Sequence, residues 1–450
     1  MPNGAREREV RALSVFSADW VLPVAGAPIE DGAISVADGR VAAVGPGAEL
    51  GEGRRFREAA IVPGLVNVHV HLASAADAAL GDGLPFGDWL RLLAERHQAL
   101  DDADRLALAR LGAHHCLAAG TTTVCDVSPT AASALACAEA GLRATAYVEL
   151  FRDDPAAARE RFERRTADFE PSAMVRLGAS PHSPYTATLA VWEAAYELGL
   201  PVTAHVAESP DEVEFTTRGT GRLARVAEFA GVASSGTTPV RALAAAGLLR
   251  PGLLAAHCVQ VDDEETGLLA GSRVAVAHCP RANAALGCGI APLRELLDAG
   301  VVVGLGTDGL ASTPSLVLWD DVRAALAFAR ARARDPGTLS GADALRLATS
   351  CGARAAGFAD AGTLEPGTHA DFAVVSLAGV LPLTRDAVAD ALVAVAGRER
   401  ILATYVGGVL RYERGQEPKA DLLAAVEDAR RRMLAGADTE FFSRRGAGVR

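Results

Sequence analysis

Two histidines one residue apart are the first candidates for chemistry in this sequence. They end the apolar run "VPGLVNVHVHLAS" at residues 62–74, as His69 and His71. Side chains alternate between the two faces of a strand, so both imidazoles would lie on the same face. That geometry suits two ligands of one metal ion, although two hydrogen-bonded core histidines would give the same pattern.

Two further donors follow apolar runs elsewhere in the chain. His205 stands in "TAHVAE" and Asp308 in "GLGTDG". With His69 and His71 they supply the nitrogen and oxygen ligands that zinc or ferrous iron accepts, and they leave a position open for water. We therefore expect one divalent metal ion per chain, zinc before iron.

Three more titratable residues stand near these donors. Glu208 follows His205 by three residues, where a carboxylate that is not a ligand can move protons at a metal-bound water. Taken alone, Glu208 would be better explained as an exposed loop glutamate. His257 ends the run "LLAAHCV" and is a candidate to orient the attacking hydroxide or to polarise the substrate, whereas we expect His278 to be structural.

The elements that must position these residues are strands alternating with helices. Eight apolar β-runs, separated by stretches rich in Ala, Leu and Arg, span 61–71, 121–128, 143–150, 175–183, 201–208, 253–259, 273–280 and 301–308. Nearly continuous apolar strands that alternate with helices indicate a parallel sheet buried on both faces. Eight of them over about 250 residues predict an α/β fold of the (β/α)8, or TIM barrel, type.

A barrel would gather the polar strand endings into one place. The C-terminal ends of all eight strands form one rim, where active sites of this fold lie. The runs end in polar residues at His71, Asp126, His182, Glu208, His257, His278 and Asp308.

The flanking segments predict a second, smaller β-sandwich domain. Residues 1–60 show short strands and turns and form its first part, and residues 359–450 supply the second part with a C-terminal helix and a tail. The catalytic barrel is expected to span 61–358.

Charge and composition narrow the class of partner. The chain has 44 Lys and Arg against 56 Asp and Glu, a net charge of -12, which disfavours nucleic acid and anionic membrane. We find no signal peptide and no apolar run long enough for a membrane span. The seven cysteines are scattered and never in a CxxC pair, which indicates reduced thiols and a cytoplasmic protein.

The motifs resemble the amidohydrolase superfamily, in its single-metal deaminase and chlorohydrolase branch. The resemblance runs in order through "VPGLVNVHVHL", "AAGTTTVCDV", "SPHSPYT", "HVAES", "AAHCVQVDDEE", "VAHCPRANAALGCGIAPL", "VVVGLGTDGLAS" and "GTLEPGTHADFAV". It implies that His69, His71, His205 and Asp308 bind the metal, that Glu208 and His257 transfer protons and orient hydroxide with help from Asp308, and that His182 contacts the substrate.

The resemblance also implies a single metal ion. Related barrels with two ions commonly bridge them with a carboxylated lysine on the fourth strand. The fourth run of this chain offers "GASPHS" instead, and the chain's one lysine, Lys419, lies outside the barrel.

Within the branch, the stretches "PFGDWL", "HVAESPDEVEF" and "CPRANAALGCGIAPL" look most like bacterial aminodeoxyfutalosine deaminases of the alternative menaquinone pathway. Those enzymes remove the 6-amino group of an adenine nucleoside. Deaminases of methylthioadenosine or S-adenosylhomocysteine share the same ligand set. Three departures from the usual pattern, at Ala73, Ala282 and Gly309, lie near the expected pocket and bear on the substrate.

Three further residues are candidate substrate contacts. Arg281 in "CPRAN" and Arg152 beyond the third run could pair with a substrate carboxylate, although a solvated loop arginine is the commoner explanation for each. Trp89 in "PFGDWL" is the third candidate.

Other functions stay open at this point. A triazine chlorohydrolase or a cyclic amide hydrolase could use the same ligands, and a barrel that has lost catalysis would be a binding or scaffold protein. The absence of a basic stripe disfavours a nucleic-acid module. A homodimer is the default expectation for such an enzyme.

Overall fold

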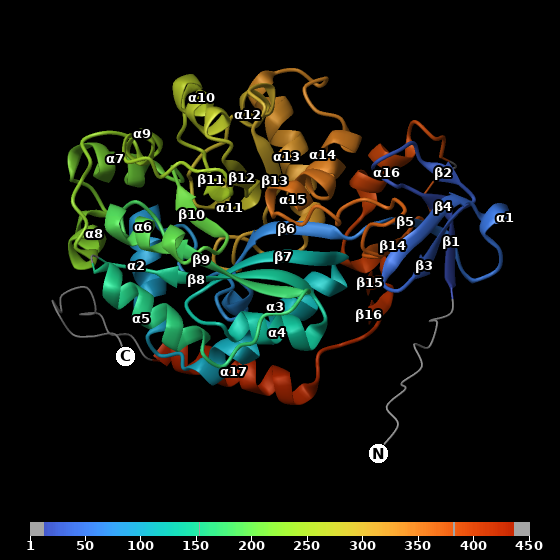
Figure 1. Cartoon of the computed structure of the whole chain (residues 1–450), viewed down its shortest axis with the longest axis horizontal. Helices are drawn as coiled ribbons and strands as arrows, with labels where there is room; N and C mark the ends of the chain where they lie inside the picture. Colours follow the sequence, from blue (N-terminus) through green and yellow to red (C-terminus); the bar gives the residue numbers. More distant parts are fainter. Residues whose placement is uncertain (1–12, 153, 381–382, 436–450) are drawn as a thin grey trace, which may run out of the picture.

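The protein was analysed as a computed structural model, which describes residues 13–152, 154–380 and 383–435. Two sheets of eight strands each organise the chain (Figure 1). One is the barrel, and the other is built from segments near both ends of the sequence. Within the described residues, no helix has the length and apolarity needed to cross a membrane.

The barrel confirms the predicted fold class, because its eight strands are parallel and paired in chain order. They are β6 (Leu65–Val70), β7 (Thr121–Ser128), β8 (Arg143–Leu150), β9 (Val175–Pro181), β10 (Val202–Val206), β11 (Leu253–His257), β12 (Ala275–His278) and β13 (Val302–Leu305). The ring closes between its first and last strands, where Val70 pairs with Asp308 and the Asp308 amide donates to the His69 carbonyl at 3.0 Å.

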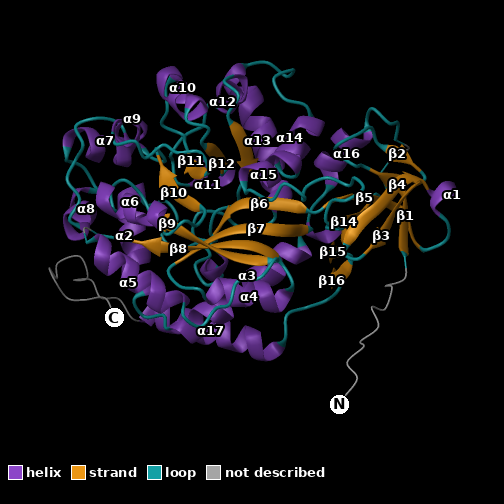
Figure 2. Ribbon diagram, in the orientation of Figure 1, coloured by secondary structure: helices purple, strands orange, loops and turns teal. Residues whose placement is uncertain are grey.

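Helices cover the outside of the barrel (Figure 2). Those that follow strands are α3 (Asp102–Ala118), α4 (Ala132–Ala140), α5 (Pro155–Thr166), α6 (Leu189–Glu197), α9 (Pro239–Ala245), α10 (Asp263–Gly271), α12 (Leu293–Asp298) and α13 (Leu318–Ala333). Local sequence fixes several starts: Asp101 and Asp262 form capping boxes before α3 and α10, and Asp154 precedes a proline at the first position of α5.

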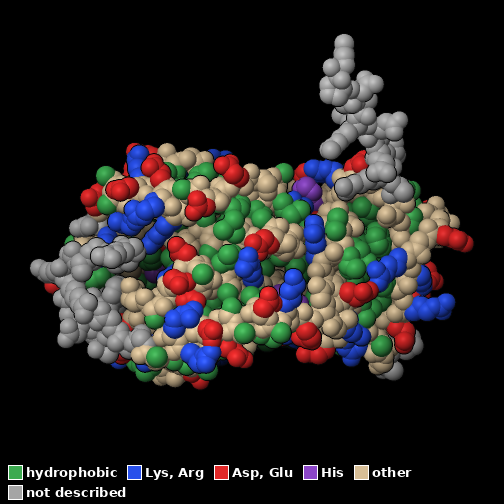
Figure 3. All heavy atoms as spheres, turned by 90° about the horizontal axis from the view of Figure 1, so that it is seen from below, with side chains coloured by type: hydrophobic (Ala, Val, Ile, Leu, Met, Phe, Trp, Pro, Cys, Tyr) green, Lys and Arg blue, Asp and Glu red, His purple; other side chains and the backbone are tan. Residues whose placement is uncertain are grey.

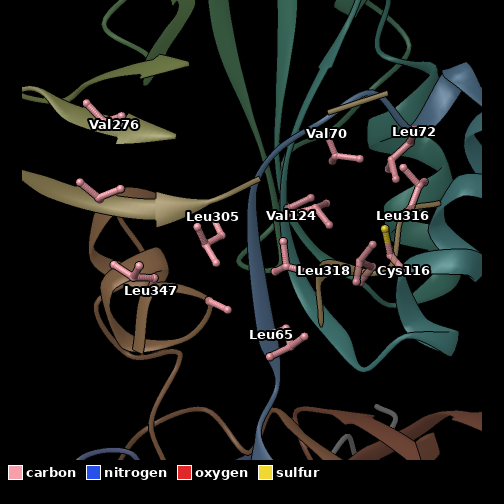
Figure 4. Close-up of a cluster of buried hydrophobic side chains, with 14 of the residues drawn as sticks. Leu65, Val70, Leu72, Cys116, Val124, Val276, Leu305, Leu316, Leu318 and Leu347 are labelled. Atoms are coloured by element: carbon pink, nitrogen blue, oxygen red, sulfur yellow. The ribbon is translucent and has the colours of Figure 1, made fainter. Parts of the chain in front are cut away.

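Shorter helices gather at the strand ends. η1 (Leu72–Ser74), α2 (Phe86–His97), α7 (Pro210–Arg218), α8 (Ala224–Ala230) and α11 (Pro280–Ala285) lie at the C-terminal rim, and α14 (Gly341–Leu347) and α15 (Ser350–Ala355) follow the last barrel helix. The largest buried apolar cluster lies between the barrel strands and their helices. Figure 4 shows part of it, with Leu65 and Val70 of β6, Leu305 of β13 and Leu347 of α14.

The second sheet runs in the order β16-β15-β14-β5-β1-β3-β4, with β2 paired to β1. Its strands are β1 (Ser14–Val21), β2 (Ile29–Glu30), β3 (Gly32–Ala37), β4 (Arg40–Pro46), β5 (Arg54–Pro63), β14 (Phe372–Ser376), β15 (Ile401–Val406) and β16 (Val409–Glu413), and the short α1 (Gly47–Leu50) follows β4. In a flat sheet, two strands three positions apart, such as β1 and β15, would be separated by roughly 14 Å. Yet the rings of Phe16 on β1 and Tyr405 on β15 lie 4.9 Å apart. The two layers of the predicted sandwich are therefore one sheet curled over its own core.

The sequence predicted a single barrel strand over the apolar run at 61–71. In the structure this run is divided between the two sheets. Residues up to Pro63 pair with β14, and the barrel strand begins at Leu65. Gly64 makes the crossing, where a Cβ would lie 2.1 Å from the Thr122 hydroxyl oxygen. An apolar pattern does not show this change of partner, because the residues on both sides of Gly64 are fully buried.

The C-terminal part of the chain also contacts the barrel. α16 (Val388–Val395) and the turn η2 (Arg398–Arg400) precede β15, and α17 (Ala420–Ala435) packs along α3 (Figure 1). Arg430 of α17 donates to the carbonyl of Ala76 in the loop that follows the metal-binding run. The expected tail, 436–450, and the first twelve residues lie outside the described residues.

A buried ion pair joins the two sheets and generates a stability prediction. The Arg143 guanidinium of β8 contacts Asp371, beside β14, at 2.8 Å, and their side chains are 4% and 1% exposed. Asp371→Ala would leave a buried charge without a partner, so we expect urea denaturation to show a loss of about 3–5 kcal/mol in the free energy of unfolding.

The matched control is Glu139→Ala, which breaks the exposed pair of Glu139 with Arg110. We expect it to cost less than about 1 kcal/mol. Equal losses of unfolding free energy in the two variants would show that the buried pair of Arg143 with Asp371 stabilises the fold no more than an exposed pair does.

Candidate metal centre

The six residues that the sequence singled out for metal binding and proton transfer meet at the C-terminal rim. His69 lies on β6 and His71 follows that strand, His205 lies on β10 and His257 ends β11. Glu208 and Asp308 lie just beyond β10 and β13. Their ligand atoms fall into two adjacent groups, His69 with His71 and His205, and Glu208 with His257 and Asp308, and within each group these atoms lie within 4.8 Å of one another.

The spacing of the donors fits one ion. Asp308 Oδ1 lies 3.3 Å from His71 Nε2 and 3.6 Å from His69 Nε2. Hydrogen bonds of an imidazole to a carboxylate are shorter, at about 2.7–2.9 Å. A tetrahedral ion with bonds of about 2.0–2.2 Å separates its ligand atoms by roughly 3.3–3.6 Å. The donor set therefore has the dimensions of a coordination shell.

Hydrogen bonding around the imidazoles supports the same interpretation. His71 Nδ1 donates to the carbonyl of Val127 and His205 Nδ1 to the carbonyl of His182, both at 2.9 Å. These bonds leave each Nε2 with a lone pair for a metal. His69 is 1% exposed, and neither of its ring nitrogens has a hydrogen-bond partner in the part of the chain that the structure describes. An unsatisfied buried polar atom costs about 1–3 kcal/mol, a cost that a bound ion would remove.

Unusual backbone geometry aims two of the groups. His257 has a φ of 73° and Asp308 a φ of 64°, in the left-handed region that non-glycine residues seldom adopt. In addition, the pairing of β6 with β7 shifts register between Asn67 and Val70. Such strained positions and bulges collect at functional sites, where they redirect side chains.

Asp308 is held as an ionised carboxylate. Its Oδ2 accepts a hydrogen bond from the Ser312 hydroxyl at 2.7 Å. Burial opposes its charge, but the neighbouring His69 and His71 outweigh that effect and lower the pKa of Asp308 below its ordinary value. An ionised oxygen donor is what a divalent ion requires.

Glu208 is shifted the opposite way. Burial, reinforced by the charges of Asp308 and Glu212, raises the pKa of Glu208 well above its ordinary value. Glu212 also accepts hydrogen bonds from the amides of Ala207 and Glu208, at 3.0 and 2.7 Å, which fixes the backbone there. The structure thus places a carboxyl group whose pKa is raised beside one whose pKa is lowered.

His257 lies between these groups. Its Nε2 is 3.6 Å from Glu208 Oε1 and has no hydrogen-bond partner, and its Nδ1 is 2.9 Å from Asn283 Oδ1. Burial lowers the pKa of His257 to about 4, so its ring is neutral at pH 7. The Asn283 contact fixes Nδ1 as the donor and leaves Nε2 as the acceptor facing the centre.

Two predicted substrate contacts lie beside the centre. The His182 ring is 4.7 Å from the His205 ring, and its Nδ1 lies 2.7 Å from the Thr186 hydroxyl. Trp89 belongs to an apolar cluster of rim residues, with Phe86, Tyr185, Phe215, Leu223, Val226, Ala227, Val259, Cys288 and Ala291. Its indole nitrogen is buried without a partner.

The two arginines differ from each other. Arg281 contacts the fully buried Asp321 at 2.6 Å and also donates to the carbonyls of Ser315 and Val317. The structure therefore does not bring it to the centre as a free cation. Arg152 lies over the ring of Phe229, with Cζ 4.5 Å from the ring centroid, and has no carboxylate partner within 4 Å among the described residues.

Several contributing residues were missed by reasoning from the sequence. Asn283 and Ser312 lie within the quoted motifs, but neither carries a charge that would mark it. Ser74 donates to the carbonyl of His71 at 2.6 Å and accepts from the amide of Leu310 at 2.8 Å, so it joins the two metal-binding loops. His278 is buried and lies outside both donor groups.

The sequence profile of the amidohydrolase family matches residues 60–411. A 5-methylthioadenosine/S-adenosylhomocysteine deaminase of Pelotomaculum thermopropionicum is 34% identical over 361 residues, which cover 77% of this chain and 80% of that protein. The deaminase of the same name from Moorella thermoacetica is 32% identical over 433 residues, with 92% and 98% covered.

Solved structures show the same fold. A zinc-bound adenosine deaminase of Xanthomonas campestris superposes with a TM-score of 0.81 at 27% identity and covers 94% of this chain and 98% of its own. A zinc-bound atrazine chlorohydrolase of Arthrobacter aurescens has a TM-score of 0.79 at 24% identity, with 93% and 99% covered, and indicates the fold alone.

The donor geometry predicts which histidines hold the metal. We expect His71→Ala to lower affinity for zinc by more than the 10–100-fold typical of changes outside the ligand shell. His278→Ala, which removes a buried rim histidine outside the donor groups, should keep one ion per chain. Competition with a chelator measures the affinity; equal affinities in the two variants would exclude His71 as a ligand.

Proposed function

This chain belongs to the amidohydrolase family, and from that premise we propose that it is a metal-dependent hydrolytic deaminase of an adenine nucleoside. One observation carries the proposal: a donor set for a single ion lies beside Glu208, a buried carboxyl group whose pKa is raised well above its ordinary value. Relatives at 32–34% identity that are named adenosine-derivative deaminases support the same conclusion.

We propose His69, His71, His205 and Asp308 as ligands of one ion, zinc before iron, since three imidazoles and a carboxylate suit both metals and a related adenosine deaminase binds zinc. Such an ion lowers the pKa of a bound water to about 7 and so supplies a nucleophile at neutral pH.

Glu208 has the properties of the proton donor. Its raised pKa favours the protonated form of the carboxyl group, as a proton donor requires. Donation to the ring nitrogen beside C6 makes that carbon electrophilic, and the carboxylate left behind can accept a proton and pass it to the departing amine. Ammonia leaves and an oxygen replaces it at C6.

His257 positions the attacking oxygen. Its neutral Nε2 faces the centre and is 3.6 Å from Glu208, while Asn283 fixes the ring from the other side. The apolar cluster that contains Trp89 borders the same rim and limits access of bulk water, which strengthens electrostatic interactions inside. We propose His182, Trp89 and Arg152 as substrate contacts. Arg281 is a weaker candidate, because its guanidinium group already pairs with Asp321.

The substituent on the nucleoside is the finer question. The motif resemblance favours aminodeoxyfutalosine and hence a step of menaquinone biosynthesis. The relatives favour methylthioadenosine or S-adenosylhomocysteine. Arg152, a rim cation without a carboxylate partner in the described chain, favours a substrate that bears a carboxylate, as aminodeoxyfutalosine and S-adenosylhomocysteine do.

One departure from the family pattern has a structural explanation. A Cβ at Gly309 would lie 3.0 Å from the Ser74 hydroxyl oxygen and 3.3 Å from the His71 Cβ. The glycine therefore leaves room for the bridging serine. Ala282 is fully buried on α11 and Ala73 is half-buried, and nothing in the structure relates either of them to a substrate.

The proposed setting is the cytoplasm, with a small-molecule substrate and a homodimer as the expected assembly. All seven cysteines are free, and six of them are buried, as suits a reducing compartment. Acidic and basic side chains are interspersed over the face seen in Figure 3, without the basic stripe that a nucleic-acid partner would need.

The function is tested by ammonia release from metal-replete protein. The panel comprises aminodeoxyfutalosine, methylthioadenosine, S-adenosylhomocysteine, adenosine, guanine and cytosine, with chloride release from a triazine assayed in parallel. We expect ammonia from adenine nucleosides, with one preferred by kcat/KM. Silence from all of them while one ion per chain is bound would refute the deaminase proposal.

Glu208→Gln tests the proton donor. An amide cannot donate and then recover a proton, so kcat should fall by about 10²–10⁴-fold while metal content stays at one ion per chain. Glu214→Gln, a change of the same kind on the helix that follows, should leave kcat unchanged. Near-normal turnover by the Glu208 variant would remove this residue from proton transfer.

A further inference from the structure

A second cavity lies at the opposite end of the barrel from the metal centre. Its volume is about 460 Å³, and it is lined by residues at the starts of β9 to β13 and by the end of α15. Each of these strands runs from the cavity towards the rim, so their lengths separate the two sites by roughly 15 Å. The proposed deaminase reaction uses none of the residues that line it.

The charge of the cavity is its unusual feature. Arg176, Arg273 and Arg354 line it, and no Asp or Glu is among the lining residues. Many arginines elsewhere in the described part of the chain pair with carboxylates, as Arg110 does with Glu139 at 2.6 Å. Across the described residues, none of the three cavity arginines has a carboxylate oxygen within 4.0 Å.

One of these arginines is fixed in place and two are available. The Arg176 guanidinium donates to the Thr145 hydroxyl at 2.8 Å and to the carbonyl of Ala356 at 2.6 Å, and it lies over the ring of Phe358. Arg273 and Arg354 are exposed. Among the described residues, the one hydrogen bond of their guanidinium groups is a weak contact of Arg354 with the sulfur of Cys351.

The surroundings strengthen the attraction for an anion. Val274, Val301 and Val302 form apolar walls, and a low local dielectric increases the interaction of a charge with the guanidinium groups. Three like charges that share one concave site repel each other until an anion neutralises them. A single carboxylate would offset one of the three, whereas a phosphate group brings up to two negative charges and matches the planar donors of arginine.

We propose that this cavity binds a small molecule through its phosphate or diphosphate group. The volume falls within the range of small-ligand sites, about 300–1,000 Å³. The inference does not depend on the proposed deaminase activity, since the cavity and the metal centre share no residue.

Isothermal titration of the metal-replete protein tests the proposal, with inorganic pyrophosphate and ribose 5-phosphate as probes at constant ionic strength. We expect one equivalent of at least one probe to bind, and the better probe identifies an inorganic or an organic phosphate as the ligand type. Arg273→Gln/Arg354→Gln should weaken that binding at least about tenfold, because charge-assisted hydrogen bonds are lost.

The control is Arg57→Gln/Arg334→Gln, which removes the same charge from exposed positions outside the cavity and should bind as the unaltered protein does. Equal affinity in all three proteins would overturn the proposal, because it would locate the anion at the metal or on the general surface. Absence of binding to the unaltered protein would overturn it as well. Ala270→Glu, which puts a carboxylate beside the arginines, gives an independent variant that should also lose binding.

Discussion

The closure of the barrel and the formation of the metal centre depend on the same few atoms. The amide of Asp308 donates to the carbonyl of His69, and this bond joins the last strand segment to the first. The side chains of the same two residues then face each other across 3.6 Å, too far for a hydrogen bond and the right distance for two ligands of one ion. Two further hydrogen bonds join the same two strand segments. The side-chain amide of Asn67 donates to the Thr307 hydroxyl, and the Thr307 backbone amide donates to the side-chain oxygen of Asn67, which holds the segments in register.

The second organising feature is the difference in pKa that their surroundings give to two neighbouring carboxyl groups, Asp308 and Glu208. Neighbouring imidazoles lower the pKa of Asp308, whereas burial and neighbouring carboxylates raise the pKa of Glu208 well above its ordinary value. Acid–base enzymes commonly separate the pKa values of two such groups and so give them different roles. In the proposed mechanism this separation assigns Asp308 to the metal and Glu208 to proton transfer. Their closeness to His257 lets both act on one bound substrate.

Much of this arrangement could be predicted from the sequence. Eight apolar runs alternating with helical stretches predicted all eight barrel strands, and the barrel then required the polar residues that end seven of these runs to meet at one rim. The junction at Gly64 could not be predicted, because residues on both sides of it are buried and apolar whichever sheet they join. The role of Ser74, which links the loops that carry His71 and Asp308, was also missed. Its hydroxyl fits there only because Gly309 has no side chain, and the sequence gives no sign of this contact.

The two arginines show a related limit. Arg281 and Arg152 look equivalent as loop cations near the rim, yet Arg281 is occupied by Asp321, forty residues further along the chain. A long-range partner of this kind has no local sequence signal. The three arginines at the far end of the barrel are equally inconspicuous in the sequence. They line one cavity only because the starts of β9 and β12 and the end of α15 lie at the same end of the barrel.

A crystal structure of the zinc-loaded protein, with the ion located by its anomalous scattering, would test the central claim most directly. The account predicts one ion bonded to His69, His71, His205 and Asp308 at about 2.0–2.2 Å, with Glu208 outside the coordination shell. An ion bonded to Glu208, or two ions at the rim, would contradict it.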